Sequence, residues 1–301
     1  MRKVLSYLVL LLIALGAAGW FLTAPSPLSD DVTAGLTGDP AHGKAVFTAG
    51  GCASCHSAPG AEGEAKLILA GGRAFPSEFG TFYAPNISAS EDAGIGAWTV
   101  QDLANAMLRG VSPAGQHYYP AFPYTSYTKA KPQDVADLRA YLETLPADST
   151  PSRDHDVAFP FNIRRAVGVW KILYFRQDFV LQEVDSAELA QGRYLVEALG
   201  HCAECHTPRT ALGGLNTSRW LGGAPNPSGQ GRIPNITSGG LSWSEEEIAE
   251  YLSSGFTPDF DVVGGEMADV VANTSQLTDE DRMAIALYLK AVPPVTGGVP
   301  D

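Results

Sequence analysis

The stretch Cys52-Ala53-Ser54-Cys55-His56 decides how this chain of 301 residues is organised, because it recurs as Cys202-Ala203-Glu204-Cys205-His206. The two pentapeptides lie 150 positions apart, and their surroundings repeat as well. Pro-Asn-Ile follows the first motif at 85–87 and the second at 234–236. A collinear series of matches indicates internal duplication. The sequence therefore predicts two related domains, each built around one Cys-x-x-Cys-His motif.

The duplication divides the chain into successive segments. Residues 149–184, between the two copies, are too apolar for a flexible linker, and we expect them to pack against both domains. The predicted segments are a signal-anchor or transmembrane segment at 1–24, a tether at 25–35, the first domain at 36–148, the interdomain segment at 149–184, the second domain at 185–296 and a tail at 297–301.

Helix-start signals occur at matching places in the two copies. Asp39 precedes a proline, and capping-box patterns occupy 99–102, 244–247 and 278–281. Pro132 and the stretch 187–199 indicate the remaining helices. Runs with the two-residue period of strands are weak throughout, so the predicted fold class is all-α, with long loops. Gly43 predicts a close helix crossing beside Tyr141, because only a missing side chain lets two backbones approach closely.

Composition limits the classes of function. Apolar residues make up 45% of the chain, which is enough for a packed core. The formal net charge of −13 argues against a nucleic-acid partner, because such partners need clustered Lys and Arg. An acidic protein of this kind is expected to dock a partner with a basic surface.

The N-terminus carries a membrane-targeting signal. Arg2 and Lys3 precede an uncharged run, Val4 to Leu22, which as a helix spans about 28 Å. A cleaved signal peptide usually has a shorter apolar region and small residues near its end, where this chain has Trp20 and Phe21. We therefore expect residues 4–22 to anchor the chain, with cleavage to a soluble periplasmic form as the alternative. The positive-inside rule places the rest of the chain outside the cytoplasm.

Three kinds of chemistry use a Cys-x-x-Cys pair. A zinc site usually combines two pairs close in sequence, and a thioredoxin-like site needs a neighbouring βαβ pattern; this chain has neither. The third is covalent attachment of haem, in which two thiols bind the porphyrin and the adjacent His binds the iron. The duplicated motif predicts two covalently bound c-type haems. The attachment residues are Cys52, Cys55, Cys202 and Cys205, and the proximal ligands are His56 and His206.

The two copies differ in the residue expected to supply the sixth iron ligand. Met267 lies 61 residues after His206, where a distal loop is expected to return to the second haem, and its thioether suits an electron-carrying iron. Phe122 stands at the equivalent position of the first copy and cannot ligate iron. His117 is one candidate ligand for the first haem. The alternatives are a five-coordinate or water-bound iron, with His117 as an ordinary hydrogen-bonded loop residue.

Further side chains are expected around the haems. Amide groups in the two Pro-Asn-Ile stretches would donate hydrogen bonds to the haem edges, indole N–H groups would reach propionates, and guanidinium groups would neutralise them. These candidates are Asn86 and Asn235, Trp98 and Trp243, and Arg73 and Arg232. The remaining histidines His42, His155 and His201 are expected at the surface or behind the ligands.

Over about residues 35–296 the chain resembles the diheme c-type cytochromes that serve bacterial dehydrogenases as exported or membrane-anchored subunits. The stretches that carry the resemblance are the two Cys-x-x-Cys-His motifs, 80–87, 94–98, 119–124 and 265–267. The resemblance implies electron transfer from a flavin, molybdenum or quinoprotein partner. Many such proteins have a ligating Met near position 122, so Phe122 departs from the pattern and leaves the first haem's coordination open.

Two functions follow from these expectations. The first is a diheme electron carrier on the periplasmic side of the bacterial inner membrane, which passes single electrons from a dehydrogenase to a quinone, an oxidase or a soluble cytochrome. The alternative is a peroxidase-like haem enzyme that binds a small molecule at a five-coordinate first haem.

Overall fold

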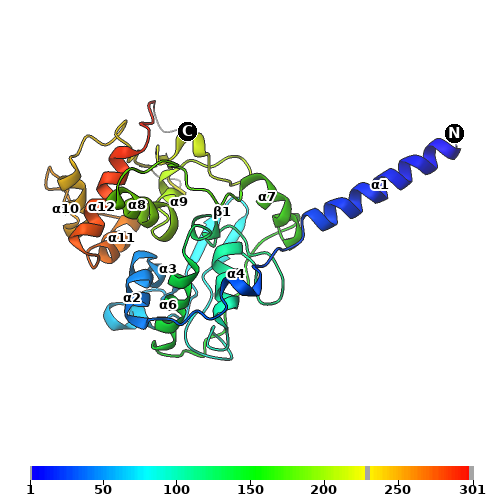
Figure 1. Ribbon diagram of the computed structural model, residues 1–301, viewed down its shortest axis with the longest axis horizontal. Helices are drawn as coiled ribbons and strands as arrows, with labels where there is room; N and C mark the ends of the chain where they lie inside the picture. The colour runs from blue at the N-terminus through cyan, green and yellow to red at the C-terminus, as the bar shows by residue number, and fades with distance from the viewer. Residues whose placement is uncertain (1, 228–230, 298–301) are drawn as a thin grey trace.

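Each repeat of the sequence folds as a group of short helices joined by long loops, and α1 (Arg2–Leu22) projects from the resulting body (Figure 1). The computed structural model describes residues 2–227 and 231–297, so the predicted tail lies outside the described residues except for Gly297. The first domain contains α2 (Pro40–Ala49), α3 (Cys52–His56), α4 (Val100–Arg109), α5 (Tyr124–Tyr127) and α6 (Pro132–Glu143). After α7 (Val167–Tyr174) come α8 (Ala187–Tyr194), α9 (Ala203–His206), α10 (Glu245–Ser254), α11 (Glu266–Thr274) and α12 (Asp279–Ala291). Short 3₁₀ or π turns occupy Asp30–Val32, Gly63–Leu67, Arg164–Ala166, Leu195–Leu199 and Thr217–Arg219.

The predicted helix starts are confirmed. The Asp39 carboxylate accepts a hydrogen bond from the backbone N–H of Ala41 at the start of α2. Capping boxes begin α4 at Thr99 and α10 at Ser244, each with a hydroxyl and a carboxylate that satisfy backbone N–H groups reciprocally. α4 and α10 both end at a glycine in the left-handed conformation, Gly110 and Gly255 respectively.

The same helix crossing holds each domain together. At Gly43, where α2 crosses α6, a Cβ atom would lie 2.0 Å from the carbonyl oxygen of Asp137. At Gly192, where α8 crosses α12, a Cβ atom would lie 1.9 Å from the carbonyl oxygen of Ala284. Tyr141 lies directly beside Gly43, as expected from the sequence, and Tyr288 takes the same place beside Gly192.

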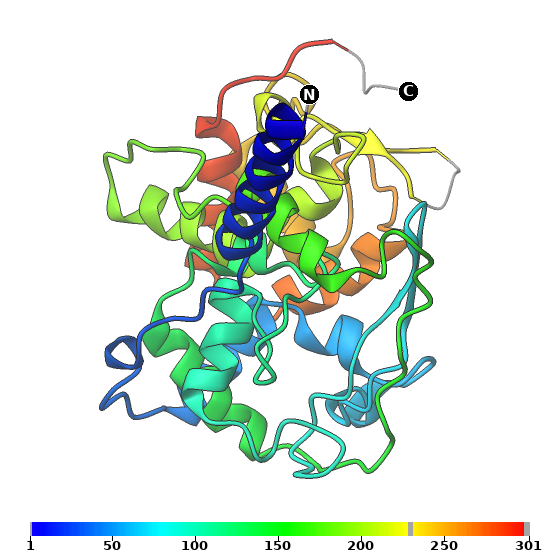
Figure 2. The ribbon, with the colours of Figure 1, turned by 90° about the vertical axis from the view of Figure 1, so that its right-hand side faces the viewer.

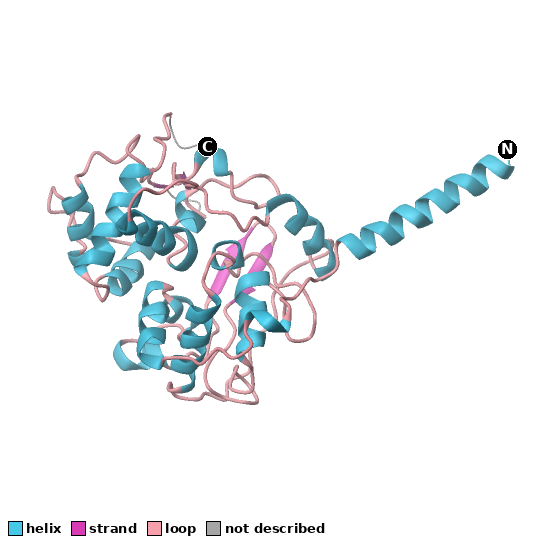
Figure 3. Cartoon of the chain, viewed as in Figure 1, coloured by secondary structure: helices cyan, strands magenta, loops and turns pink. Residues whose placement is uncertain are grey.

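Two short hairpins make the all-α prediction incomplete (Figure 3). β1 (Ala74–Ser77) pairs antiparallel with β2 (Gly80–Tyr83), and β3 (Ala224–Pro225) pairs with β4 (Arg232–Ile233). Strands of two to four residues are too short to produce an alternating pattern that stands out in sequence. The described part of the chain is nevertheless mostly helical.

α1 stands apart from both domains. Its 21 residues have a mean hydropathy of 2.2, and none of them is buried. Among the described residues it is the one helix long and apolar enough to cross a membrane. Figure 2 looks along this helix and shows α7 beside its root.

The segments that flank the first domain are held firmly in place. The predicted tether lies along α4, because Leu28 N donates to Asn105 Oδ1 at 2.7 Å. The interdomain segment packs against both domains, as predicted: Asp156 pairs with Thr81 of the first domain. In the second domain, the backbone N–H groups of Val180 and Leu181 donate to the carboxylate of Glu197, which is completely buried.

Candidate functional site

The two Cys-x-x-Cys-His motifs form matching helical turns. Residues 52–56 form α3, and Cys202 is the N-cap of α9, so the first Cys and the second Cys of each motif lie one turn apart. A residue with positive φ precedes each turn, Gly51 in the first copy and His201 in the second. This tight turn lets both thiols of a motif face the same side of the backbone.

A backbone carbonyl orients each motif histidine. His56 Nδ1 lies 2.8 Å from the carbonyl oxygen of Pro85, and His206 Nδ1 lies 2.9 Å from that of Pro234. Because a carbonyl can only accept, Nδ1 carries the hydrogen and Nε2 keeps a free lone pair. Burial lowers the pKa of both histidines, which favours the neutral imidazole that binds metal.

The two prolines are site residues that the sequence analysis missed. The repeated Pro-Asn-Ile stretches drew attention to their asparagines, whereas the carbonyl of the preceding proline makes the contact. The signal was the nearly constant spacing of this proline, 29 residues after His56 and 28 residues after His206.

The asparagines themselves have a structural role, which leaves Asn86 no amide hydrogen for the haem edge, whereas a contact of Asn235 with the haem edge stays a prediction. Asn86 Nδ2 donates to the carbonyls of Asp148 and Thr150, so both of its amide hydrogens are used. Asn235 Nδ2 donates to the carbonyl of Val295. Each asparagine therefore connects two segments of its domain. One is the loop with the proline, and the other is the chain directly after the last helix, α6 or α12.

Desolvation raises the pKa of all four cysteines and so favours the thiol over the thiolate. All of them are described and are free thiols, so they form no disulfide. Burial raises the pKa of Cys52 and of Cys202 to about 12. Redox-active and metal-binding cysteines instead have a lowered pKa, because the thiolate is the reactive form. Three of the cysteines are half-buried and Cys205 is exposed, and paired thiols that remain reachable beside a histidine with a free Nε2 fit the covalent attachment of haem in both domains.

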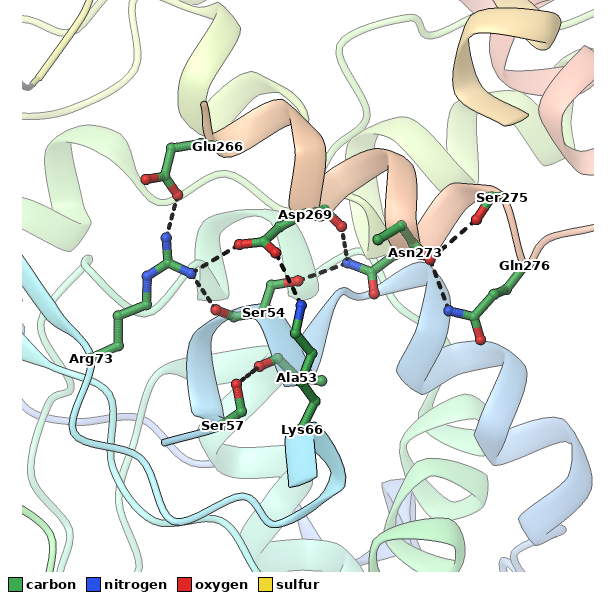
Figure 4. Close-up of polar contacts among 11 residues, drawn as sticks. Ala53, Ser54, Ser57, Lys66, Arg73, Glu266, Asp269, Asn273, Ser275 and Gln276 are labelled. Carbon is green, nitrogen blue, oxygen red and sulfur yellow. Dashed lines mark hydrogen bonds and ion pairs between the residues drawn. The ribbon is translucent and has the colours of Figure 1, made fainter. Parts of the chain in front are cut away.

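Arg73 pairs with the second domain (Figure 4), which the sequence analysis did not foresee, and its expected contact with a propionate stays a prediction. Its guanidinium binds the carboxylate of Glu266 and lies 3.3 Å from Asp269 Oδ2, both on α11. It also donates to the carbonyl of Ser54 inside the first motif. Asn273 Nδ2 of α11 donates to Ser54 Oγ at 2.8 Å, so α11 is docked directly on α3.

The other expected haem neighbours lie in equivalent places. Trp98 and Trp243 are half-buried just before α4 and α10, and their carbonyls accept hydrogen bonds from Arg139 and Lys290 respectively. Arg232 lies in β4. Contacts of these side chains with haem propionates stay predictions.

Met267 is the second residue of α11, where the sequence analysis expected a loop. Its side chain is half-buried. The carboxylates of Glu266 and Asp269 on either side of it hold this helix on the first domain. In the first domain the equivalent Phe122 packs among Tyr118, Tyr124 and Tyr127, with ring centroids 5.8–6.4 Å from its own.

The position of His117 agrees with the alternative of a hydrogen-bonded loop residue, and its ligation of the first haem stays untested. Its Nε2 lies 2.9 Å from the carbonyl oxygen of Thr23, at the root of α1, and the residue is 3% exposed. The carbonyl of His117 accepts a hydrogen bond from Arg164. Nε2 is therefore used to hold the N-terminal segment, whereas the buried Nδ1 has no hydrogen-bond partner among the described residues. Loop position alone had suggested ligation, and the partner 94 residues away was invisible to that reasoning.

Replacing His117 by alanine should therefore leave the spin state of the first haem unchanged. The lost hydrogen bond and packing should cost about 1 kcal/mol of stability or slightly more. Electron paramagnetic resonance of the ferric holoprotein measures the spin state. Conversion of one low-spin haem to high spin in this variant would show that His117 is a ligand of the first haem.

The two motif turns lie against each other. His201 Nε2 lies 3.3 Å from the carbonyl oxygen of Gly50, and Thr125 Oγ1 donates to Glu204 Oε1 at 3.0 Å. The ring of His201 also meets Tyr127 edge-on, with centroids 5.7 Å apart. The residues just before one motif thus touch the residues just before the other.

Comparisons with known proteins agree with this arrangement. Residues 40–146 match the family model for cytochrome c, and residues 187–289 match that for subunit III of cbb3-type cytochrome c oxidase. A diheme c-type cytochrome of Cereibacter sphaeroides is 57% identical over 98% of this chain and 99% of its own length. The fructose dehydrogenase cytochrome subunit of Gluconobacter japonicus is 38% identical over 83% of this chain, and the alcohol dehydrogenase (quinone) cytochrome c subunit of Gluconacetobacter polyoxogenes is 34% identical over 84%.

The chain spans about half the length of the two dehydrogenase subunits, 52% and 56% respectively. The match to the C. sphaeroides protein, in contrast, covers nearly all of both chains. With two covalent haem c groups and an electron-transfer function, the chain belongs to the diheme c-type cytochromes.

Proposed function

We propose that this cytochrome accepts single electrons from a dehydrogenase partner and delivers them to the respiratory chain at the periplasmic face of the inner membrane. A haem iron carries one electron at a time by alternating between the ferric and ferrous states. The observation that carries the proposal is the close approach of the two motif turns, where His201 contacts Gly50, supported by the bond from Asn273 of α11 to Ser54 of the first motif. The names of the two dehydrogenase subunits support the choice of donor.

Residues of this chain would hold the two haems in unequal ways. We assign the thioether bonds to Cys52, Cys55, Cys202 and Cys205, and the proximal ligands to His56 and His206. Met267 would supply the sixth ligand in the second domain, where the contacts of α11 with Arg73 restrict its movement. The proline carbonyls would fix the plane of each imidazole.

Anchoring through residues 4–22 is part of the proposal. Arg2 and Lys3 precede the apolar run, which is the order expected for a helix whose N-terminus stays in the cytoplasm. The uniform exposure of α1 supports a lipid environment for it.

Flash reduction of the full-length protein tests the electron-transfer path. A photoreductant is used to add less than one electron per molecule. After the flash, the added electron should redistribute between the two haems. Because the motif turns touch within one chain, the rate of this redistribution should not depend on protein concentration. A rate proportional to concentration would contradict a path inside the molecule.

Replacing Arg73 by glutamine should loosen α11. Glu266 is 80% exposed, so its ion pair contributes little, and the loss of the contacts to Asp269 and the Ser54 carbonyl should dominate. We expect a cost of about 1 kcal/mol, which lowers the temperature at which Met267 leaves the iron by roughly 2–4 °C. The sulfur-to-iron charge-transfer absorption measures this temperature. Lys44→Gln removes one exposed cation of the same domain and should change nothing.

The position of His117 favours a second candidate, a small-molecule reaction at the first haem. Phe122 in the distal loop cannot ligate iron, and His117 Nε2 is engaged by the Thr23 carbonyl, which supports a first haem without a sixth protein ligand. Cyanide binding to about one haem per ferric chain would favour this candidate. Two haems that resist cyanide would favour the carrier alone.

A further inference from the structure

The segment 159–176 differs in charge from the rest of the protein. It contains the cations Arg164, Arg165, Lys171 and Arg176 and no carboxylate, in a chain whose net charge is −13. Lys171 points inward, because its Nζ donates to the carbonyls of Arg109 and Gly110 at the end of α4. The three arginines remain at or near the surface. This distribution of charge is suited to an anionic partner.

The same segment exposes large apolar side chains. Val169, Ile172 and Leu173 lie three and four positions apart, so they share one face of α7, and they are 48–53% exposed. The opposite face of α7 packs inward: Trp170 Nε1 donates to the carbonyl of Leu212 at 2.8 Å, and Tyr174 contacts Thr210. We call the exposed residues the α7 face; they are Val169, Ile172 and Leu173 together with Phe159, Phe161 and Ile163 from the preceding turn.

The helix α7 lies beside the root of α1 (Figure 2). A Cβ atom at Gly168 would lie 2.2 Å from the carbonyl oxygen of Thr23, so α7 touches the chain directly after α1. The Arg165 guanidinium lies 4.3 Å from the ring centroid of Trp20 and binds its carbonyl. Trp20 is two residues before the end of α1 and Arg165 reaches it, so the segment 159–176 lies within about one helical turn of that end.

We propose that the α7 face lies in the headgroup layer of the same membrane that α1 crosses, with the arginines of this segment bound to anionic phospholipid headgroups. This inference rests on the proposed anchor. Tryptophan near the end of a spanning helix marks the membrane interface, and the segment is continuous with that level. Exposed apolar side chains beside cations are typical of elements that enter the boundary between headgroups and acyl chains.

This contact would orient the protein. The first domain would rest on the membrane through α7. Figure 1 shows α10 and α11 at the opposite end of the body from α1, so Met267 and its helix would face the aqueous periplasm. A protein partner is the competing occupant of the α7 face, and a bilayer free of other proteins separates the two.

Spin labels at single introduced cysteines test the proposal in the full-length holoprotein. The four native cysteines carry haem, so an introduced cysteine would be the one free thiol. The label replaces Ile172 on the α7 face or Leu12 within α1. The matched control is Val262, which is also apolar and exposed (69%) but belongs to the second domain. Collisions of each label with oxygen and with a nickel chelate are compared in vesicles of phosphatidylcholine and phosphatidylglycerol.

We expect the ratio of oxygen to chelate collisions in these vesicles to be several-fold higher at positions 12 and 172 than at position 262, where the label should stay in water. A lipid-exposed position 12 with an aqueous position 172 would overturn the inference and leave the anchor intact. An aqueous position 12 would refute the anchor, and an aqueous position 172 in that sample would overturn the inference too. In vesicles of phosphatidylcholine alone, the ratio of oxygen to chelate collisions at position 172 should fall, because the anionic headgroups are missing. The same ratio in both kinds of vesicle would overturn the assignment to anionic headgroups.

Discussion

Replacing Met267 by alanine should remove the sulfur ligand of the second haem and lower its reduction potential by roughly 0.2 V, because axial ligands tune haem potentials over about 0.8 V. A thioether stabilises ferrous iron, and alanine offers no donor in its place. The sulfur-to-iron charge-transfer band should disappear from the ferric spectrum. Potentiometric titration of the full-length protein measures the accompanying shift.

Met283 provides the control for this substitution. It belongs to the same domain and lies in α12, where 36% of its surface is exposed. Met283→Ala should keep the band and both potentials. If Met267→Ala keeps the band while Met283→Ala loses it, the assignment of the ligand is wrong.

Replacing Gly192 by alanine should destabilise the second domain strongly. In an open helix this change stabilises by about 1 kcal/mol, because glycine has the poorer helix propensity. Here the new methyl would lie 1.9 Å from the carbonyl oxygen of Ala284 and 3.0 Å from Tyr288 Cβ, so α8 and α12 must move apart. Overpacking of this kind costs about 1–3 kcal/mol, and forced backbone movement brings the cost to the upper end.

Thermal unfolding of the holoprotein, followed by circular dichroism, measures this effect. A loss of about 3 kcal/mol should lower the melting temperature by roughly 6–12 °C. Gly264→Ala is the matched control, because a Cβ atom there would meet nothing within 4 Å and its φ is not positive. Gly192→Ala with a melting temperature equal to or above that of the wild type would show that the two helices can separate at little cost.

The sequence predicted features that depend on near neighbours along the chain. Caps at Asp39, Thr99 and Ser244 bind backbone groups two or three residues ahead, so their patterns are readable directly. The crossing at Gly43 was predictable because the duplication paired it with Gly192 in the same context. In both cases the residue type carries its own physical requirement.

Features that depend on distant partners were missed. α11 begins at Glu266 after the N-cap Gly265, which has no side chain to cap it, and contains two adjacent valines, so neither propensity nor capping indicated a helix. Arg73 binds carboxylates nearly 200 residues away, and His117 binds Thr23, 94 residues away. The cations and polar groups were visible in sequence, but their partners come from the packing of one domain on the other and on the N-terminal segment.

The central claim is that two adjacent c-type haems carry electrons and that only the second has a methionine ligand. A potentiometric titration of the full-length protein, followed at the sulfur-to-iron band, tests it most directly. We expect two one-electron steps, with the band lost entirely in the step of higher potential. A band divided between the two steps, or the absence of such a band from the fully ferric protein, would contradict the claim.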